Sequence, residues 1–225
     1  MKTSKYHFNH TSFESHMLVY ERIMEKAKVL EVGCASGYFG KKLIEKKCRV
    51  WGVEKDCKEA KKASSKFEEV FILDLDDITN QIPGYIRKNS FDYILFMDIL
   101  EHLKDPASVL SFFSTYLKNT GKIIISVPNI AFISIRLALL RGKFSYTDQG
   151  IMDNTHLRFF TKDTLFALIK KSELIIEDLE ISSGFSQISV IGKYLDKIPK
   201  YWQYIISKKF PSLLGYQFIA ICRKK

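Results

Sequence analysis

The fold of this chain is decided by the stretch Val29-Leu30-Glu31-Val32-Gly33-Cys34-Ala35-Ser36-Gly37-Tyr38. Its first four residues form a short, largely apolar run of the kind that becomes a buried parallel strand. Gly33, Ala35 and Gly37 then keep the next loop bare, so that backbone N–H groups can approach a ligand closely. A helical pattern starts directly after the loop, and the N-terminal end of a helix attracts anionic or polar groups. A turn of this kind suits a nucleotide-like ligand.

An acidic residue further along the chain strengthens this interpretation. About twenty residues after the loop, a second predicted strand, Arg49-Val50-Trp51-Gly52-Val53, ends in Glu54. A carboxylate at this place can accept hydrogen bonds from the hydroxyl groups of a ribose. Either feature alone is a weak signal, but the bare turn and the acid together predict a nucleoside site.

Two cofactors compete for such a site, a nicotinamide dinucleotide and S-adenosylmethionine. The dinucleotide fingerprint is G-x-G-x-x-G/A, with a pyrophosphate on the helix N-terminus. Counted from Gly33, the loop reads Gly-x-Ala-x-Gly, and Tyr38 occupies the last position that should be small. Counted from Ala35, the pattern ends correctly at Gly40 but lacks its first glycine. A nicotinamide oxidoreductase is therefore the least favoured of the functions considered.

The pattern Glu31-x-Gly33-x-Ala35-x-Gly37 resembles motif I of the class I S-adenosylmethionine-dependent methyltransferases, with Ala35 where glycine is usual. The resemblance continues in order and covers roughly residues 28–130. The later matches are Val53-Glu54-Lys55-Asp56, Phe71-Ile72-Leu73-Asp74-Leu75, the strand and loop from Phe91 to His102, and the strand from Gly121 to Asn129.

This resemblance implies S-adenosylmethionine as cofactor and S-adenosylhomocysteine as product. It implies that Glu54 binds the ribose and that Asp74 meets the adenine amino group. We expect Glu31 to accept hydrogen bonds from the neighbouring loop or from the cofactor amine. The full set of predicted cofactor contacts is Glu31, Gly33, Cys34, Ala35, Gly37, Tyr38, Glu54, Lys55, Asp74, Leu75, Met97 and His102.

Strands and helices alternate along most of the chain, which predicts right-handed crossovers and a parallel sheet. The expected fold is α/β, a doubly wound, mostly parallel seven-stranded sheet with a capping insert after strand five. Further strands are expected at 174–181 and 216–222. Helices are expected at 10–26, 37–47, 57–67, 79–88, from Pro106 with Asp105 as N-cap, at 130–140, at 162–171 with Thr161 as N-cap, and along an apolar stripe at 188–205 that Pro199 interrupts.

The chain is expected to form a single methyltransferase domain over residues 1–225. Residues 1–27 form an N-terminal helix that either covers the cofactor or packs on the sheet edge. Residues 28–130 are the cofactor-binding half, 131–161 a substrate cap, and 162–225 a C-terminal part with strands six and seven. Because ligands bind outside the carboxyl ends of parallel strands, the predicted site residues should surround one crevice.

Methyl transfer needs the acceptor placed in line with the sulfonium, and often a base that removes one proton. His156 is the best-placed histidine, because imidazole titrates near neutrality and His156 lies inside the predicted cap. Asp98 is the second candidate for a catalytic role, while His102 can line the cofactor site or act as base. Asn129 and Arg158 are the predicted substrate contacts.

Two motifs that are missing from the sequence narrow the range of possible methyl acceptors. The chain lacks the Asn/Asp-Pro-Pro-aromatic stretch that accompanies nucleobase amino methylation in this family, and it contains no Pro-Cys pair for methylation of a pyrimidine carbon. The segment from Tyr146 to Thr161 resembles a bacterial subgroup related to ubiquinone-pathway O-methyltransferases, which often accompanies glycan-assembly enzymes. That resemblance implies a hydroxyl acceptor on a small molecule, a sugar or a lipid-linked compound.

Composition bounds the remaining alternatives. The chain has 225 residues, 46% hydrophobic residues and a formal net charge of +10, and no apolar signal segment opens it. Its 4 cysteines and 5 histidines show no paired metal-ligand or disulfide spacing, so we predict no metal site and a cytoplasmic location.

From Phe185 onward, 8 basic residues face 1 acidic residue, and aromatic residues lie among them. This basic part could contact an anionic membrane, could contact RNA, or could be a solvated face over an aromatic core. We favour the third interpretation, the solvated face. Nucleic acid is not an expected partner. The alternatives kept open are an RNA methyltransferase and a non-catalytic cofactor-binding module.

Overall fold

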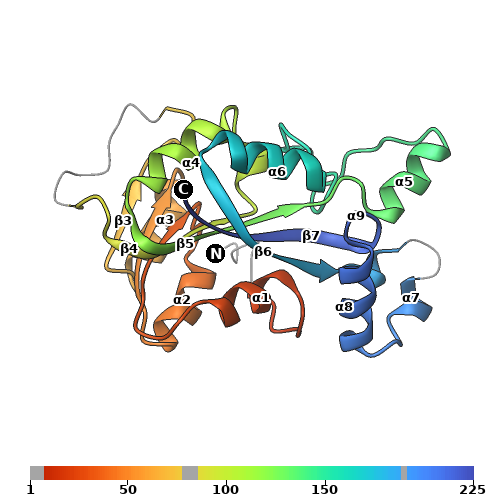
Figure 1. The fold of residues 1–225 in the computed structure, drawn as a ribbon, viewed down its shortest axis with the longest axis horizontal. Helices are drawn as coiled ribbons and strands as arrows, with labels where there is room; N and C mark the ends of the chain where they lie inside the picture. Colours follow the sequence, from red (N-terminus) through yellow and green to blue (C-terminus); the bar gives the residue numbers. More distant parts are fainter. Residues whose placement is uncertain (1–7, 78–85, 189–191) are drawn as a thin grey trace.

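The computed structural model describes residues 8–77, 86–188 and 192–225, which form a twisted sheet with helices on both faces (Figure 1). The strand order across the sheet is β3-β2-β1-β4-β5-β7-β6. Strand β7 runs antiparallel to β5 and β6, and the other pairs are parallel. The predicted fold class is confirmed. The strands are β1 Lys28–Val32, β2 Arg49–Glu54, β3 Glu69–Ile72, β4 Phe91–Met97, β5 Leu117–Pro128, β6 Leu174–Ser183 and β7 Gly215–Lys224.

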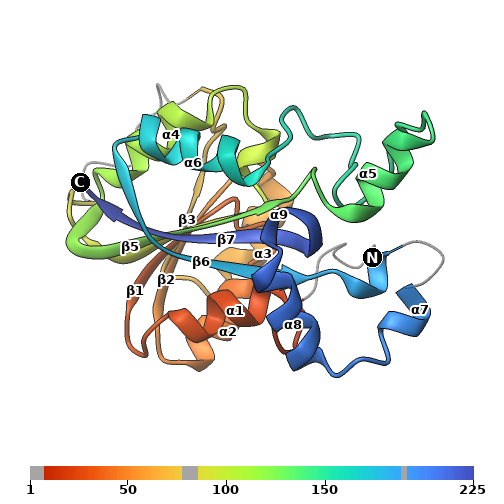
Figure 2. The same cartoon turned by 45° about the vertical axis from the view of Figure 1, so that its right-hand side comes forward.

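Helices cover the sheet in two layers. Helices α4 and α6 lie on one face, while α1 and α2 lie on the other (Figures 1 and 2). The α-helices of the described residues are α1 Ser15–Arg22, α2 Tyr38–Glu45, α3 Cys57–Ser64, α4 Pro106–Ser114, α5 Ile133–Leu140, α6 Lys162–Lys171, α7 Gly192–Leu195, α8 Lys200–Lys209 and α9 Pro211–Leu214.

The apolar strand residues explain this layering. Successive side chains of a strand point to opposite faces of the sheet. Accordingly, Leu30 and Ile94 belong to the apolar cluster beneath α4 and α6, whereas Val29 and Leu95 belong to the cluster beneath α1 and α2. Because both faces are covered, β1 and β4 read as nearly continuous apolar runs rather than alternating ones.

Two predicted helix starts are confirmed. The Asp105 side chain accepts a hydrogen bond from the backbone N–H of Ser108, and Pro106 occupies the first turn of α4. Thr161 and Thr164 form a reciprocal capping box at the start of α6. Both caps satisfy N–H groups that have no partner inside the helix.

Some element boundaries differ from the expectation. The first helix runs only from Ser15 to Arg22, because Phe13 has a left-handed φ of 64° and Ile23 is extended. Strand β3 ends at Ile72, so Asp74 lies in the turn after the strand rather than within it. The expected helix at 79–88 falls largely outside the described residues. The predicted stripe at 188–205 divides into α7 and α8 at Pro199.

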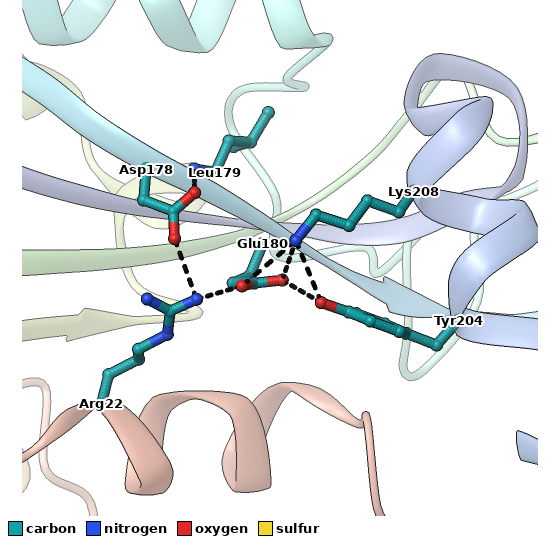
Figure 3. A network of polar contacts seen from close by, with 6 residues as sticks. All are labelled: Arg22, Asp178, Leu179, Glu180, Tyr204 and Lys208. Atoms are coloured by element: carbon teal, nitrogen blue, oxygen red, sulfur yellow. Dashed lines mark hydrogen bonds and ion pairs between the residues drawn. The ribbon is translucent and has the colours of Figure 1, made fainter. Parts of the chain in front are cut away.

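A buried acid ties the N-terminal and C-terminal helices to the sheet. Glu180 of β6 is only 4% exposed, and its carboxylate accepts hydrogen bonds from Arg22, Tyr204 and Lys208 (Figure 3). Arg22 also pairs with Asp178 at 2.8 Å. The network fixes α1 and α8 against β6, and it uses one cation of the basic C-terminal part inside the protein.

A separate small apolar cluster lies beyond the carboxyl ends of the central strands. Phe132, Ile151, Phe185 and Ile188 form its buried centre. Helix α5 extends outward from this end (Figures 1 and 2), and none of its residues is buried. Among the described helices, none combines the length and apolar character needed to cross a membrane.

Candidate active site

The loop after β1 has the backbone conformation that its small residues allow. Gly33 and Gly37 have φ values of 78° and 70°, in the left-handed region that glycine adopts without steric cost. A side chain at Gly33 would also meet Ile99 at 2.8 Å. Ala35 adopts a φ of 45°, which is unusual for a residue with a side chain. This strain accounts physically for the glycine that is usual at the position of Ala35.

Glu54, the predicted ribose-binding acid, holds this loop from the tip of β2. Its Oε2 accepts a hydrogen bond of 2.8 Å from Ala35 N–H, and its Oε1 accepts one of 2.8 Å from Asp56 N–H. The N–H groups of Gly33 and Cys34 both donate to the carbonyl of Val53. Sequence reasoning did not anticipate that Glu54 also organises the glycine loop.

Glu31 lies beneath the loop and is 4% exposed. Its Oε2 accepts a hydrogen bond of 3.1 Å from Gly40 N–H in the first turn of α2. Burial raises the pKa of Glu31 to about 8, although the Gly40 hydrogen bond opposes this change. Glu31 therefore joins strand β1 to helix α2 and supports the loop from below.

Two adjoining cavities lie at the carboxyl ends of β1, β2 and β4. The larger has a volume of about 440 Å³ and the smaller about 220 Å³. Four residues line both cavities, namely Gly33, Glu54, Ile99 and His102. The shared wall is the point where the bare loop meets the predicted ribose acid, so one elongated ligand can reach both cavities.

Half of the predicted site residues line the larger cavity. Its predicted lining residues are Gly33, Ala35, Tyr38, Glu54, Met97, Asp98, His102 and His156. The smaller cavity is lined by Lys55, Asp74 and Leu75, and Lys55 Nζ pairs with Asp74 Oδ2 at 2.6 Å. Hydrogen bonding to Lys55 holds the pKa of Asp74 below its usual range. The smaller cavity is thus the place where the predicted adenine contacts meet.

Three of the predicted contacts lie outside both cavities. Cys34 is buried in the apolar cluster under α2. The Asn129 side chain donates to the carbonyls of Gly215 and Ser212 and accepts from Ala131 N–H, which fixes the end of β5 to the start of β7. None of Cys34, Asn129 and Gly37 lines either cavity. The predicted ligand contacts of these residues remain predictions.

The Arg158 side chain also lines neither cavity and instead contacts backbone carbonyl groups. Its guanidinium donates to the carbonyls of Leu103 and Lys104, and its own N–H donates to the carbonyl of Glu101. These bonds fasten the segment 131–161 to the loop after β4. The predicted substrate contact of Arg158 remains a prediction, and the geometry gives this residue a structural connection.

Two histidines from distant segments meet at the larger cavity. The rings of His102 and His156 are edge to face, with centroids 4.8 Å apart. His156 Nδ1 lies 3.1 Å from the Ile151 carbonyl, and only a protonated Nδ1 can donate to that oxygen. Burial, together with the nearby His102, lowers the pKa of His156. At neutral pH His156 is therefore uncharged, with Nε2 as its basic nitrogen.

Carboxyl groups lie beside the histidines. Asp98 Oδ1 accepts a hydrogen bond of 2.6 Å from the Gln217 amide, and burial raises the pKa of Asp98 to about 7. Glu101 is 1% exposed, and burial and the Asp98 charge raise its pKa well above the usual range. One oxygen of Glu101 has no hydrogen-bond partner. Asp98 can therefore accept or deliver a proton near neutral pH.

Sequence reasoning missed several residues of this cavity, namely Glu59, Glu101, Gln149, Gly150, Ile151, Asp153, Tyr216 and Gln217. The only sequence feature that pointed to Glu101 was its position next to His102 in the loop after β4. Tyr216 and Gln217 lie at the start of the antiparallel strand β7, and no local pattern predicts that Gln217 contacts Asp98 in the loop after β4.

One cluster at this site has the donor set of a cation site. Glu101, His102 and His156 each offer one ligand atom, and these atoms lie within 4.8 Å of one another. Carboxylate and imidazole groups are ordinary ligands of divalent transition metals. The predicted absence of a metal remains a prediction.

Comparisons with known proteins agree with this geometry. A family model described as a methyltransferase domain matches residues 10–178. A ubiquinone biosynthesis O-methyltransferase of Colwellia psychrerythraea is 29% identical over 200 residues, which cover 88% of this chain and 74% of that protein.

Solved structures share the fold at low sequence identity. A structure from Thermotoga maritima, described as an S-adenosylmethionine-dependent methyltransferase and possible histamine N-methyltransferase, is similar with a TM-score of 0.63 and 17% identity, covering 95% of this chain and 89% of that one. The cyclase SpnF is similar with a TM-score of 0.62 and 15% identity, covering 99% of this chain and 85% of that one. The similarity to SpnF means that the fold alone does not define the reaction.

Proposed function

The chain belongs to the class I S-adenosylmethionine-dependent methyltransferases, and we propose that it methylates a hydroxyl oxygen of a small-molecule, sugar or lipid-linked acceptor. The family fixes the cofactor, whose sulfonium supplies an electrophilic methyl group. The names of the relatives favour oxygen as acceptor atom, because they include ubiquinone biosynthesis O-methyltransferases. The single observation that carries this proposal is the neutral His156 on the wall of the larger cavity.

The residues at the cavities fit the cofactor. A carboxylate has about four acceptor positions, and the backbone N–H groups of Ala35 and Asp56 use two of those of Glu54. Two positions are left, as many as the two hydroxyls of a ribose require. Asp74 and Lys55 form the polar wall of the smaller cavity, where an adenine amino group can donate to Asp74.

His156 serves as the proposed base. The Ile151 carbonyl holds the Nδ1–H tautomer, so Nε2 keeps a lone pair for the acceptor proton. A base in this position contributes about 10²–10⁴-fold, which is less than the contribution of placing the two reactants in line. Asp98 assists by orienting the acceptor or by taking up the proton. We assign the segment 131–161 the role of substrate cap, since residues 149–151, 153 and 156 line the cavity.

Methyl transfer to a model diphenol tests this proposal. The protein is incubated with methyl-labelled S-adenosylmethionine and either 4-methylcatechol or its amine counterpart 4-methylaniline. We expect labelled methyl ether from the diphenol, no labelled amine, and loss of the ether signal in His156→Gln. Labelled 4-methylaniline without the ether would contradict an oxygen acceptor.

Contact with an anionic membrane is a further part of the proposal. The favoured aromatic core of the basic C-terminal part is wrong for four of the five aromatic residues between positions 194 and 210, because their side chains are exposed, namely Tyr194, Tyr201, Trp202 and Phe210. Large apolar side chains are exposed around the end of the molecule that carries α5 and α8, namely Leu139, Leu140, Phe144, Tyr146, Leu157, Tyr194, Tyr201, Trp202, Ile205 and Phe210. Arg141, Lys143, Lys197 and Lys209 are exposed in the same segments. Apolar side chains mixed with cations are typical of surfaces that lie on anionic lipid.

Vesicle flotation distinguishes the membrane surface from a solvated face. We expect binding to phosphatidylglycerol vesicles that weakens with salt, no binding to phosphatidylcholine vesicles, and weaker binding of Leu140→Ser. The control Met24→Ser removes an exposed apolar side chain from the turn before β1 and should change nothing. Equal binding to both vesicle types would contradict this part of the proposal.

The remaining alternatives receive no support from the described residues. An RNA methyltransferase would need cations along its cavity, whereas carboxylates line the larger one. In the basic C-terminal part, Lys200 pairs with Asp196 and Lys208 with Glu180. A non-catalytic module would have no need for a histidine held in one tautomer at the cavity.

A further inference from the structure

In the described part of the chain, carboxyl groups line the larger cavity without a cation to balance them. Its ionisable carboxyl groups are Glu54, Glu59, Asp98, Glu101 and Asp153, and no lysine or arginine of the described residues lines it. The chain as a whole carries a formal charge of +10, so an acidic cavity runs against the overall balance. Within the cavity, Asp98, Glu101 and Asp153 lie on the same side as His156, away from the adenine contacts.

The nearest cations are committed to other partners. Arg158 lies in the same segment as His156, but its guanidinium donates to the Leu103 and Lys104 carbonyls. Lys55 pairs with Asp74 at the smaller cavity. Neither cation can neutralise Asp98 or Glu101 without breaking these contacts.

One carboxyl oxygen on this side of the cavity, Glu101 Oε2, has no hydrogen-bond partner among the residues that the structure describes. Its side chain is 1% exposed, and Oε2 forms no hydrogen bond with any described residue. The Glu101 carbonyl accepts bonds from Leu157 and Arg158, so the cap segment seals the residue from solvent. A buried polar atom without a partner is costly, and a ligand that brings a donor or a positive charge removes that cost.

We propose that the acceptor side of the larger cavity, formed by Asp98, Glu101 and Asp153, is a cation-preferring subsite. It accepts acceptor molecules whose reacting end is neutral or carries an ammonium group, and it excludes reacting ends with a carboxylate or phosphate. This inference rests on the proposed methyltransferase function and specifies the acceptor class. A glycan or lipid-linked acceptor must therefore keep its phosphates outside the cavity.

The same subsite distinguishes the methyl donor from its product. The sulfonium is positively charged before transfer and becomes a neutral thioether afterwards. Because the methyl group has to face the acceptor, the carboxyl groups of this side favour the charged donor. The acidic side of the cavity thus also promotes release of the product.

Calorimetric titration with two cofactor analogues tests the charge preference. Sinefungin carries an amine, protonated at neutral pH, where S-adenosylhomocysteine has an uncharged sulfur. All solutions contain EDTA, so that a divalent ion at Glu101, His102 and His156 contributes no charge. We expect sinefungin to bind about tenfold more tightly than S-adenosylhomocysteine, which equals about 1.4 kcal/mol.

Two variants and a matched control locate the effect. Asp98→Asn and Glu101→Gln keep the side-chain size. At pH 8, where Asp98 is ionised, Asp98→Asn should reduce the ratio of the two affinities at least about threefold, and Glu101→Gln should reduce it less because burial favours the protonated form of Glu101. Glu173→Gln removes an exposed carboxylate just before β6, at the opposite end of the sheet, and should leave the ratio unchanged. If Glu101→Gln does not fold, Asp98→Asn alone decides.

The outcomes separate this inference from the proposed function. Equal affinities of the two analogues in the unmodified protein, or an unchanged ratio in Asp98→Asn, would overturn the subsite while leaving the methyltransferase intact. Absence of binding by both analogues would overturn the cofactor assignment and the subsite with it. In a second arm, dopamine should bind the S-adenosylhomocysteine complex more tightly than 3,4-dihydroxybenzoate, and the reverse order would refute the exclusion of anions.

Discussion

Removing the charge of Glu54 should weaken cofactor binding far more than it changes any other property. The Glu54 carboxylate accepts two backbone hydrogen bonds of 2.8 Å each, from Ala35 and Asp56, and keeps two acceptor positions for a ribose. In Glu54→Gln the side chain keeps one oxygen and gains an NH₂ group. That NH₂ group then faces the backbone N–H of Ala35 or Asp56, and because both groups are donors, one hydrogen bond is lost.

The magnitude follows from these contacts. Hydrogen bonds to a charged group contribute about 1.5–3 kcal/mol, and neutral ones about 1 kcal/mol. Losing one charged bond and weakening the other in the ligand-free protein costs about 2 kcal/mol, which lowers Tm by about 4–8 °C for a chain of this size. The lost ribose contacts should raise the Kd of S-adenosylhomocysteine about 10- to 100-fold.

Calorimetry at 25 °C and a thermal melt of the ligand-free protein measure the two effects separately. The matched control is Asp56→Asn, which also removes one negative charge but retains a residue suited to capping α3. The control should leave the Kd unchanged and lower Tm only slightly. An unchanged Kd in Glu54→Gln, or an equal loss of affinity in the control, would refute the ribose-binding role.

Three more perturbations test the rest of the site. In Gly40→Ala the new Cβ would lie 2.2 Å from Phe67 Cζ and 2.7 Å from Glu31 Oε2. The overpacking should destabilise the folded protein by about 1–3 kcal/mol, which exceeds the gain in helix propensity of about 1 kcal/mol. A higher urea midpoint in the variant would contradict this expectation. The folded-state pKa values of Glu31 (about 8) and Asp98 (about 7) exceed the ordinary values of 4.5 and 3.8, so the folded protein binds more protons between these limits. Stability should therefore fall as pH rises, up to about pH 7 for Asp98 and up to about pH 8 for Glu31, by about 1 kcal/mol per pH unit for each group within its own range; a flat urea midpoint between pH 5 and 7 contradicts the burial argument. Replacing His156 with Gln should lower kcat about 10²–10⁴-fold and leave the Kd of S-adenosylhomocysteine unchanged, whereas full turnover would exclude His156 as the base.

The cofactor side of the site was largely predictable because its signals are local. Gly33 follows β1 and Glu54 ends the parallel neighbouring strand β2, and both line the wall shared by the two cavities. Parallel strands bring their carboxyl ends to one edge, so sequence position alone brings these residues together. Asp74 and Lys55 both line the smaller cavity and pair at 2.6 Å, although β3 ends two residues before Asp74.

The acceptor side was predicted less completely because its residues come from distant segments. Asn129 and Arg158 have the right chemistry for substrate contacts, yet their polar groups bind backbone atoms. Whether a polar side chain faces a cavity or a neighbouring carbonyl depends on its partners, and no sequence pattern lists them. Only the structure shows that Glu101 Oε2 has no hydrogen-bond partner among the described residues.

The sequence by itself determined the alternation of strands and helices, the glycine loop and the position of Glu54 at the end of its strand, because these follow from periodicity and from backbone freedom over a few residues. The tertiary structure alone decided the charge and the composition of the acceptor side. Strand β7 inserts antiparallel between β5 and β6 and brings Gln217 against Asp98, while the cap segment brings His156 against His102. These contacts join residues 119 and 54 positions apart, and only the packing of the whole chain sets which side chains meet across such separations.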